Sequence, residues 1–294
     1  MREFKFDIDD WTGGNTLGKS MGDAVGSTVD GKLFTIVTDK VRNIKIYNND
    51  IISATIDWGD GETTDVEGKM IATHDYDDNK ADNRVITVYS NSDFNDVSNQ
   101  NLITTAFLTI YEDLISYTIH AKTNKNLISR YLECGSGNII NNIIFDCVNI
   151  EAIGTTAFVN TFLRNNLNIP SSVKKLGEYC FAECSFIRRL DVPHTVKEIG
   201  DNAFYKTTFV EGLKLNEGLE YIGENAFYGC NGIEGNLVIP SSVKEIGDNA
   251  FSFNVVNHCT IYVCEDTKIN GTILQRLKTK TLLTYKKGDK PIIK

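Results

Sequence analysis

The sequence contains little proline, four residues in 294, and no apolar run that approaches the roughly 20 residues of a membrane span. Its first segment, MREFKFDIDDWTGG, lacks the apolar core of a secretory signal, so we expect neither an export signal there nor membrane insertion. The seven cysteines are odd in number, which excludes a framework that pairs all of them within one chain.

Positive charge is also scarce. Lys and Arg total 30 against 39 Asp and Glu, which gives a net charge of −9. A nucleic-acid surface needs clustered positive charge, so we predict no nucleic-acid partner. Hydrophobic residues make up 41% and charged residues 23%, a composition that excludes wholesale disorder. At 294 residues the chain favours two structural units over one.

Patterns that carry catalysis or hold metals are missing as well. The chain has no zinc-ligand spacing, no phosphate-binding glycine loop and no nucleophile elbow. Asp75, Asp77 and Asn79 begin like an EF-hand loop, but Lys80 replaces the required Gly and Ile86 replaces the required Glu. We therefore predict no catalytic residue, no metal and no cofactor, and we expect the acidic turn at 75–83 to be solvated.

An internal repeat dominates the C-terminal half. The pattern Ile/Leu-Gly-x-x-Ala/Cys-Phe occurs five times, and its Phe residues are 23, 23, 23 and 24 positions apart. These residues are Phe158, Phe181, Phe204, Phe227 and Phe251. A constant period with an isolated insertion is typical of a solenoid in which each repeat forms one coil. We expect the five rings to stack in one buried column.

Each repeat contains further conserved spacing along the coil. Two apolar residues flank an outward residue in short strands expected at 167–169, 190–192, 213–215, 237–239 and 261–263. A Val-x-x-Ile-Gly segment follows, in which the Gly is expected to allow a turn. Small polar or thiol residues stand three positions after each Phe, at Thr161, Cys184, Thr207, Cys230 and Asn254. They are expected to satisfy backbone groups, so we predict that Cys184 and Cys230 are buried thiols without a disulfide.

The outward residues of these strands form the candidate binding ladder. Its rungs are Asn168, Asp191, Lys214, Val238 and Tyr262, with Arg189 beside them. Chemically unlike rungs suit a specific surface, and Tyr262 beside Val238 predicts an exposed aromatic anchor. The alternative is that these positions are merely tolerated at the surface and bind nothing.

The segments IPSSVKKLGEYCFAEC, VPHTVKEIGDNAF and IPSSVKEIGDNAF resemble the BspA-type leucine-rich repeats, over about residues 145–263. This resemblance implies a right-handed solenoid with a parallel sheet, in a protein that binds other macromolecules or surfaces and has no enzymatic activity. Such repeats occur in bacterial surface adhesins, in some protist surface proteins and in proteins of phages and prophages.

The N-terminal half carries a second resemblance. Strand-like alternation at 33–37, 44–46, 51–56 and 84–89 surrounds Trp58-Gly-Asp-Gly61 and His74-Asp-Tyr76. This pattern resembles a PKD-type immunoglobulin-like domain, with a hairpin turn at Gly59-Asp60-Gly61 and an aromatic core. A PKD-like domain followed by leucine-rich repeats is an arrangement associated with phage and prophage structural proteins.

The expected fold is mainly β: an Ig-like PKD-type β-sandwich followed by a five-repeat solenoid with a parallel β-sheet. The expected parts are an N-terminal arm (1–32), the PKD-like β-sandwich (33–100), a bridge and N-terminal cap (101–144), the solenoid (145–263), and a C-terminal cap and tail (264–294). Apolar residues at helical spacing predict a short capping helix at 266–281, with a last strand at 282–285.

Together these patterns predict a non-enzymatic structural or binding protein. The first hypothesis is a phage virion component, such as a fibre, decoration or baseplate protein, whose partners are other virion proteins or a host-surface protein or glycan. Virion proteins assemble in the cytoplasm, which agrees with the absence of a signal in the first segment. The alternatives are a bacterial cell-surface adhesin and a carbohydrate-binding accessory module.

Overall fold

The computed structural model describes residues 32–38, 43–48, 54–67, 70–76, 83–90, 106–109, 114–119, 139–145, 151–252, 259–271, 281–289 and 291. All regular structure in these ranges is β-strand, so the prediction of a mainly β fold is confirmed. Among the described residues, no helix is long and apolar enough to cross a membrane. The predicted N-terminal arm, apart from Lys32, lies outside the described residues.

Within the described residues, nine strands precede the repeats and lie in two sheets. They are β1 (Lys32–Thr38), β2 (Asn43–Asn48), β3 (Ala54–Asp57), β4 (Thr63–Val66), β5 (Met70–Asp75), β6 (Arg84–Ser90), β7 (Ala106–Thr109), β8 (Leu114–Ile119) and β9 (Ile139–Phe145). One sheet has the order β11-β9-β8-β1-β6-β3-β4 and the other β5-β2-β7. Ile36, Ile44 and Ile86 are fully buried, as the alternation predicts, and the strands expected at 33–37, 44–46 and 84–89 are confirmed.

The predicted Gly-Asp-Gly hairpin joins β3 to β4. Gly59 and Gly61 have φ angles of 78° and 101°. Trp58 is 0% exposed, and its carbonyl accepts a 2.7 Å hydrogen bond from the Tyr76 hydroxyl. The His74 ring stacks on Trp58 with centroids 4.8 Å apart. The aromatic side chains therefore fasten the hairpin to β5, and the predicted turn and aromatic core are confirmed.

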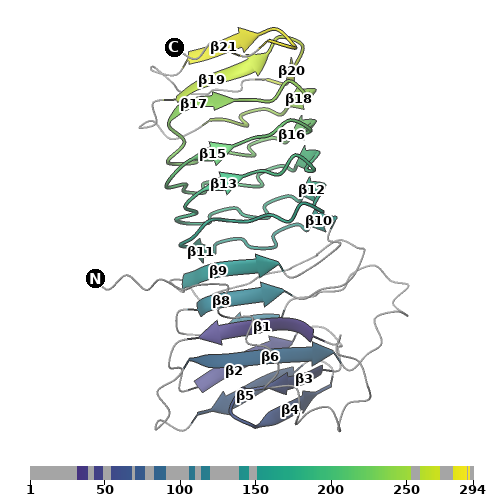
Figure 1. Cartoon of the computed structure of the whole chain (residues 1–294), viewed down its shortest axis with the longest axis vertical. Coiled ribbons are helices and arrows are strands. Elements are labelled where there is room, and N and C mark those ends of the chain that lie inside the picture. Colours follow the sequence, from purple (N-terminus) through teal and green to yellow (C-terminus); the bar gives the residue numbers. More distant parts are fainter. Residues whose placement is uncertain are drawn as a thin grey trace. The chain divides into compact units, whose positions relative to one another are not determined.

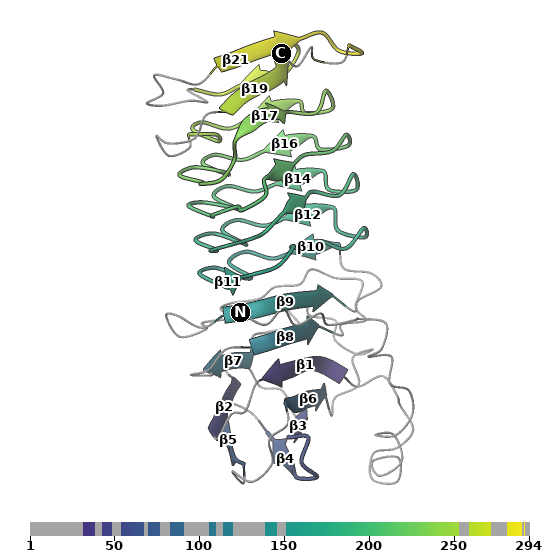
Figure 2. The ribbon, with the colours of Figure 1, turned by 60° about the vertical axis from the view of Figure 1, so that its left-hand side comes forward.

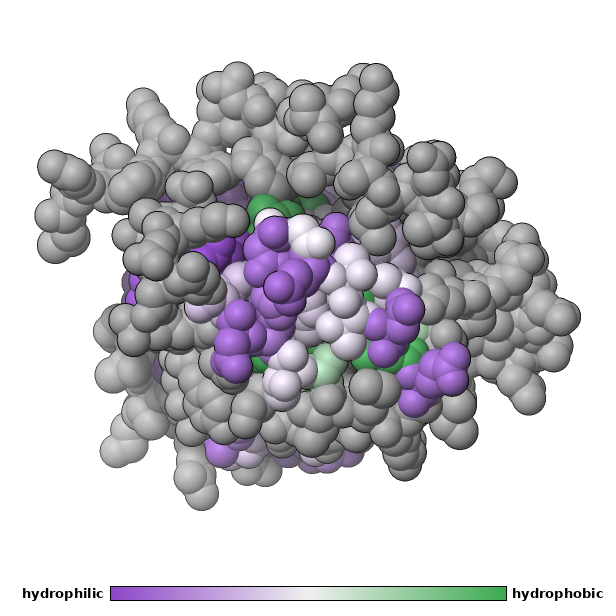
Figure 3. All heavy atoms as spheres, turned by 90° about the horizontal axis from the view of Figure 1, so that it is seen from below, coloured by the Kyte–Doolittle hydropathy of each residue, from purple (hydrophilic) through white to green (hydrophobic). Residues whose placement is uncertain are grey.

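Strand β4 forms one edge of the seven-stranded sheet. Its outward residues Thr63 and Asp65 are exposed, and Asp65 accepts a 2.7 Å hydrogen bond from Thr55. Viewed from below in the orientation of Figure 1, the described side chains are mostly hydrophilic or neutral (Figure 3). Polar side chains on an edge strand disfavour pairing with another chain.

The predicted bridge joins the two parts through strand pairing. β7 pairs with β2, and β8 pairs antiparallel with β1 and parallel with β9. β9 in turn pairs in parallel with β11 (Phe162–Leu163), which belongs to the first coil. The seven-stranded sheet therefore runs without interruption into the repeats, and the strand edge that a solenoid leaves open at its N-terminal end is paired.

The repeats place their strands in two columns of stacked coils (Figures 1 and 2). One column is a six-stranded parallel sheet of β10 (Ala152–Ile153), β12 (Lys175–Leu176), β14 (Glu198–Ile199), β16 (Tyr221–Ile222), β18 (Glu245–Ile246) and β20 (Lys268–Ile269). The other contains β13 (Leu190–Asp191), β15 (Leu213–Lys214), β17 (Gly235–Val238), β19 (Cys259–Cys264) and β21 (Thr281–Tyr285). The second column confirms the parallel strands predicted at 190–192, 213–215, 237–239 and 261–263, whereas at 167–169 only an isolated parallel bridge joins Leu167 to Leu190. The six-stranded sheet was not predicted, and it forms where the Val-x-x-Ile segments stack.

The Gly of each Ile-Gly pair is needed for close approach between coils. A Cβ on Gly247 would lie 2.4 Å from the Glu224 backbone nitrogen, closer than any real contact. The Gly247 amide donates a 2.8 Å hydrogen bond to the Ile222 carbonyl one coil earlier. The expected turn follows each of these Gly residues, as in the 3.4 Å hydrogen bond from the Ala250 amide to the Gly247 carbonyl. None of them has a positive φ angle, so the glycine is needed for the close approach of the coils and not for a left-handed conformation.

Left-handed residues stand two positions after each of these Gly residues. Thr156, Tyr179, Asn202, Asn225 and Asn249 have φ angles between 52° and 58°. Asn tolerates this conformation better than most side chains, since its short amide bonds locally. The left-handed turn therefore explains the Asn of the DNAF and ENAF segments.

The predicted column of phenylalanine rings is confirmed. Rings from successive coils stack with centroids 5.2 to 5.5 Å apart and planes within 11° of parallel. The column consists of Phe158, Phe181, Phe204, Phe227 and Phe251, all at most 1% exposed. Burial of each ring is worth roughly 1.5–3 kcal/mol, so this column stabilises every junction between coils.

Three of the small residues that follow each Phe by three positions bond to a carbonyl of the coil before them, as predicted. The buried Thr161 hydroxyl has no hydrogen-bond partner within the described residues, and Asn254 lies outside them. The Cys184 thiol lies 3.0 Å from the Phe158 carbonyl, the Thr207 hydroxyl 2.6 Å from that of Phe181, and the Cys230 thiol 2.9 Å from that of Phe204. Burial raises the pKa of the Cys184 thiol to about 12, so it stays protonated at neutral pH. Cys184 and Cys230 are free thiols, which confirms that no disulfide joins them.

The C-terminal end differs from the prediction. Residues 266–271 form a turn and strand β20 instead of the start of a helix, and 272–280 lie outside the described residues. Strand β21 confirms the predicted last strand and pairs in parallel with β19. The apolar spacing that predicted a helix here is also compatible with a further repeat. Ile269 pairs with Ile246 and so extends the six-stranded sheet.

We expect Phe204→Ala to lower the free energy of unfolding by roughly 3–5 kcal/mol, because it opens a cavity between two stacked rings. Denaturant unfolding measures the change, and the exposed Val210→Ala serves as a control that should shift it by less than about 0.5 kcal/mol. Equal effects of the two substitutions would contradict a shared ring column.

We expect Thr207→Val to cost about 1 kcal/mol, because the buried Phe181 carbonyl loses its 2.6 Å hydrogen bond. Thr207→Cys should cost less, since Cys184 and Cys230 make the same contact in neighbouring coils. Thermal or urea unfolding of the two variants tests this, and a Cys variant as unstable as the Val variant would refute the role of the column.

Candidate binding surfaces

The structure places the predicted ladder in one register. Asp191 pairs with Lys214, and Val238 pairs with Tyr262, across parallel strands. Asn168, Asp191 and Lys214 are exposed and Val238 is half-buried. The first four rungs are therefore available at the surface.

Tyr262 is not available, because it is only 4% exposed. Its neighbours Ile261 and Val263 are each 1% exposed, so both faces of β19 are covered. Alternation identifies an outward residue only where one face of a strand meets solvent. The prediction of an exposed Val238–Tyr262 anchor is therefore wrong.

Arg189 and Asp191 lie together on the exposed side of β13. Two guanidinium nitrogens of Arg189 lie 3.1 and 3.3 Å from the two carboxylate oxygens of Asp191. Both side chains are about half exposed, where an ion pair contributes at most about 1 kcal/mol. The pair neutralises its own charge and leaves a polar patch on this strand.

The outward side of the six-stranded sheet is occupied by ion pairs between coils. They join Lys174 to Glu151, Lys175 to Glu198, Lys197 to Glu220, Lys244 to Glu220 and Lys268 to Glu245. Each carboxylate already has a cationic partner in the neighbouring coil. A charged ligand on the strands of this sheet would have to compete with these contacts. Lys174 and Lys197, which precede β12 and β14, also line a groove at the edge of the sheet.

An aromatic surface lies at the corner before β13. Phe186 is 52% exposed and its ring stacks on Phe162 with centroids 6.4 Å apart. Val210, 57% exposed, donates its backbone N–H to the carbonyl of Ile187, the neighbour of Phe186. Phe162, Phe186 and Val210 form the Phe186 surface, and the exposed ion pair between Arg188 and Glu211 lies beside it.

Phe186 adopts a conformation that bulky side chains avoid. Its φ angle is 64°, in the left-handed region. Gly232 stands at the matching position two coils later, two residues after Cys230 as Phe186 is two after Cys184, and has φ 75°. Glycine adopts this angle without strain, so the chain holds an exposed ring where the fold needs only a glycine. The sequence alone does not signal this feature, because the coil between them has the buried Phe209 two residues after Thr207. The pairing of Ile187 with Phe209 leaves Phe186 as an extra residue before the core position.

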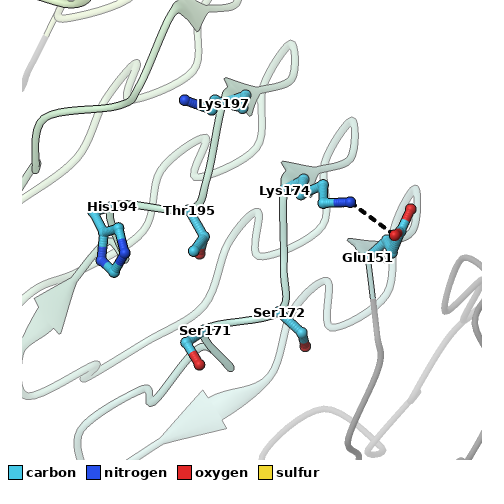
Figure 4. Close-up of a pocket in the computed structure, with 7 residues that line it drawn as sticks. All are labelled: Glu151, Ser171, Ser172, Lys174, His194, Thr195 and Lys197. Atoms are coloured by element: carbon cyan, nitrogen blue, oxygen red, sulfur yellow. Dashed lines mark hydrogen bonds and ion pairs between the residues drawn. The ribbon is translucent and has the colours of Figure 1, made fainter.

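A polar groove lies on the opposite corner, after β13. It has a volume of about 760 Å³ and is lined by Glu151, Ser171, Ser172, Lys174, His194, Thr195 and Lys197 (Figure 4). Ser171-Ser172 and His194-Thr195 are the central residues of β-turns in adjacent coils, closed by 3.0 and 3.1 Å bonds from Val173 to Pro170 and from Val196 to Pro193. The groove therefore runs across two copies of one turn.

The corresponding turn in a later coil binds a carboxylate of the chain itself. Glu217 accepts hydrogen bonds from the Ser241 and Ser242 amides at 2.9 and 3.1 Å. Partial burial raises the pKa of this carboxyl, but the hydrogen bonds from both serines outweigh that effect and hold its pKa below the usual 4.5. The backbone amides of this turn therefore bind an anionic group.

Among the described residues no group of His, Cys, Asp and Glu could hold a metal ion. The acidic turn considered for calcium lies outside the described residues between 77 and 82. The His74 imidazole is committed to the N-terminal hairpin, with Nε2 2.8 Å from an Asp60 oxygen.

Residues 127–270 match the BspA type leucine rich repeat region in six copies. They form a BspA-type leucine-rich-repeat region, as the resemblance of residues 145–263 implied. A solved structure of a T. pallidum leucine rich repeat protein is 22% identical and aligns over 57% of this chain and 78% of its own, with a TM-score of 0.33. A comparison with curated proteins gave no match.

We expect Glu217→Gln to reduce stability at neutral pH, because the neutral amide replaces charge-assisted hydrogen bonds to Ser241 and Ser242. The folded-state pKa of Glu217 is lowered, so its contribution is complete above the unfolded pKa of 4.5 and is lost as pH falls through the folded value. Urea unfolding of both proteins from about pH 7 to about pH 3 should show a difference that shrinks with acid.

The control for this experiment is Glu234→Gln, at an exposed glutamate that does not bond to the Ser241 turn within the described residues. It should leave stability unchanged across the same pH range. A Glu217→Gln difference that is constant with pH would contradict the carboxylate contact.

Proposed function

We propose that this chain is a non-enzymatic binding protein whose BspA-type leucine-rich-repeat region docks a protein partner through the Phe186 surface. Leucine-rich repeats suggest a protein-binding or surface role in general. The observation that carries the proposal for this chain is the exposed apolar cluster at one corner, in which the Phe186 ring stacks on Phe162 beside the exposed Val210.

The energetics favour a functional reason for Phe186. A non-glycine residue in this conformation costs on the order of 1–3 kcal/mol, and such strain concentrates at binding sites. The ring is 52% exposed, so its own burial offsets little of that cost. An apolar centre beside exposed charged residues, as Arg188 and Glu211 provide, is the usual composition of a protein interface.

In the finer form of the proposal, the chain is a phage virion component, such as a fibre, decoration or baseplate protein, located in the particle. The residues 33–100 are proposed to be a PKD-like Ig-type module. The Gly59-Asp60-Gly61 hairpin and the Trp58 and Tyr76 core support this. The partner would then be another virion protein or a host-surface protein. A bacterial cell-surface adhesin is the alternative, and it would use the same surface on a different partner.

We expect Phe186→Asn to abolish partner binding while stability is kept or rises by about 1 kcal/mol, since Asn relieves left-handed strain. Binding is measured against the separated proteins of the phage particle and against intact host cells, and stability by thermal unfolding. Binding to particle proteins supports the virion assignment, whereas binding to cells alone supports the adhesin.

Tyr179→Asn is the matched control. Tyr179 is also an exposed aromatic residue of the same coil, 36% exposed with a φ angle of 53°, but it lies outside the Phe186 surface. It should gain stability in the same way and bind as the parent protein does. Full binding by Phe186→Asn would refute the proposed docking surface.

A further inference from the structure

The same β-turn occurs at Ser171, His194 and Ser241, and within the described residues a carboxylate is bound at the Ser241 turn. In the turn closed by the 3.1 Å bond from Val243 to Pro240, the Ser241 and Ser242 amides point at Glu217 of the preceding coil. The turn closed by the 3.1 Å bond from Val196 to Pro193 has the same closure. Its two central amides, those of His194 and Thr195, donate no hydrogen bond within the described residues.

The difference comes from one residue of the preceding coil. Ser171 occupies the position, two residues before the Val or Leu of the repeat, that Glu217 occupies before the Ser241 turn. A serine side chain has no carboxylate, so Ser171 offers none to the amides of the next coil. The His194 turn is therefore a receptor whose internal ligand is missing.

Two further observations mark the same place. The hydroxyls of Ser172 and Thr195 are buried and have no hydrogen-bond partner within the described residues, which is rare for polar groups. The turn also lines the groove of about 760 Å³, whose lining includes Lys174 and Lys197, and the Lys174 ammonium points toward Glu151 (Figure 4). Each lysine pairs with a carboxylate, at 2.8 and 3.6 Å, but each retains further N–H donors.

We propose that the His194–Thr195 turn binds a carboxylate of an acidic segment from a partner protein. The two amides would hold its oxygens as the Ser241 and Ser242 amides hold Glu217, and the lysines would favour its charge. The groove is larger than a carboxylate, which leaves room for the residues that flank the acidic side chain. This site is separate from the Phe186 surface, so it can exist whether or not that surface binds.

The probe is an acetylated tetraglutamate peptide, with tetraglutamine as its neutral counterpart. Titration of the full ¹⁵N-labelled chain should shift the His194 and Thr195 amide resonances saturably with tetraglutamate and leave them in place with tetraglutamine. Added salt should weaken the binding, because the contact is ionic.

Ser171→Glu supplies the missing internal ligand. Its carboxylate should occupy the turn, move the His194 and Thr195 amide resonances without any peptide, and reduce tetraglutamate affinity at least tenfold. Ser171→Gln is the control for side-chain length, and it should reduce tetraglutamate affinity less than Ser171→Glu does, because its neutral amide makes no charge-assisted hydrogen bonds. Circular dichroism shows whether both variants remain folded.

Glu217→Ala tests the reverse. Removal of the internal carboxylate should leave the Ser241 and Ser242 amides vacant, and the variant should gain a second saturable response to tetraglutamate at those resonances. This arm keeps the proposal testable if Ser171→Glu does not fold.

The proposal is overturned if tetraglutamate shifts only resonances elsewhere, or if Ser171→Glu binds it as well as the parent does. Equal responses to tetraglutamate and tetraglutamine would also overturn it. If Phe186→Asn loses partner binding but still responds to the peptide, the Phe186 surface and this site are independent and the proposal holds. If the peptide gives no response while docking still depends on Phe186, only the proposal for this site is refuted.

Discussion

The contact between one coil and the next is the interaction on which the rest of this structure depends. Apart from the turns that each coil closes within itself, the backbone amides of the described coils donate to the coil before or after, as the Gly247 amide does to Ile222 at 2.8 Å. The phenylalanine rings stack in the same register at 5.2 to 5.5 Å. A substitution that shifts one coil would therefore misalign both the hydrogen bonds and the ring column.

This constraint separates the interior of the repeats from their corners. Inward positions carry side chains of similar size in successive coils, as Cys184, Thr207 and Cys230 do, because the coils stack in register. The corners carry no such requirement, and there the coils differ: Phe186 against Gly232, and Ser171 against Glu217. Specific recognition in a repeat protein is therefore expected at positions where one coil departs from the others.

Charge and strain are distributed in agreement with that separation. The six-stranded sheet pairs its lysines and glutamates between coils, as Lys268 does with Glu245 at 3.0 Å, and so presents little unsatisfied charge. The corners carry two features that the interior lacks. One is the exposed ring of Phe186, with a φ angle of 64°, and the other is the pair of His194 and Thr195 amides, which donate no hydrogen bond within the described residues. Both departures reduce stability locally and leave groups available to a partner.

The sequence alone determined the coil period, the stacked phenylalanines and the buried thiols of Cys184 and Cys230, because a 23-residue spacing places equivalent residues in one column whatever surrounds them. Tertiary structure decided the rest. Tyr262 is 4% exposed because both faces of its strand are covered, which alternation within the strand cannot reveal. Ile269 belongs to a strand because Ile246 lies beside it, although its local spacing suits a helix. Whether the His194 turn can bind a carboxylate depends on which side chain of the preceding coil lies opposite its amides. The stacking of the coils decides this, and the sequence alone does not show it.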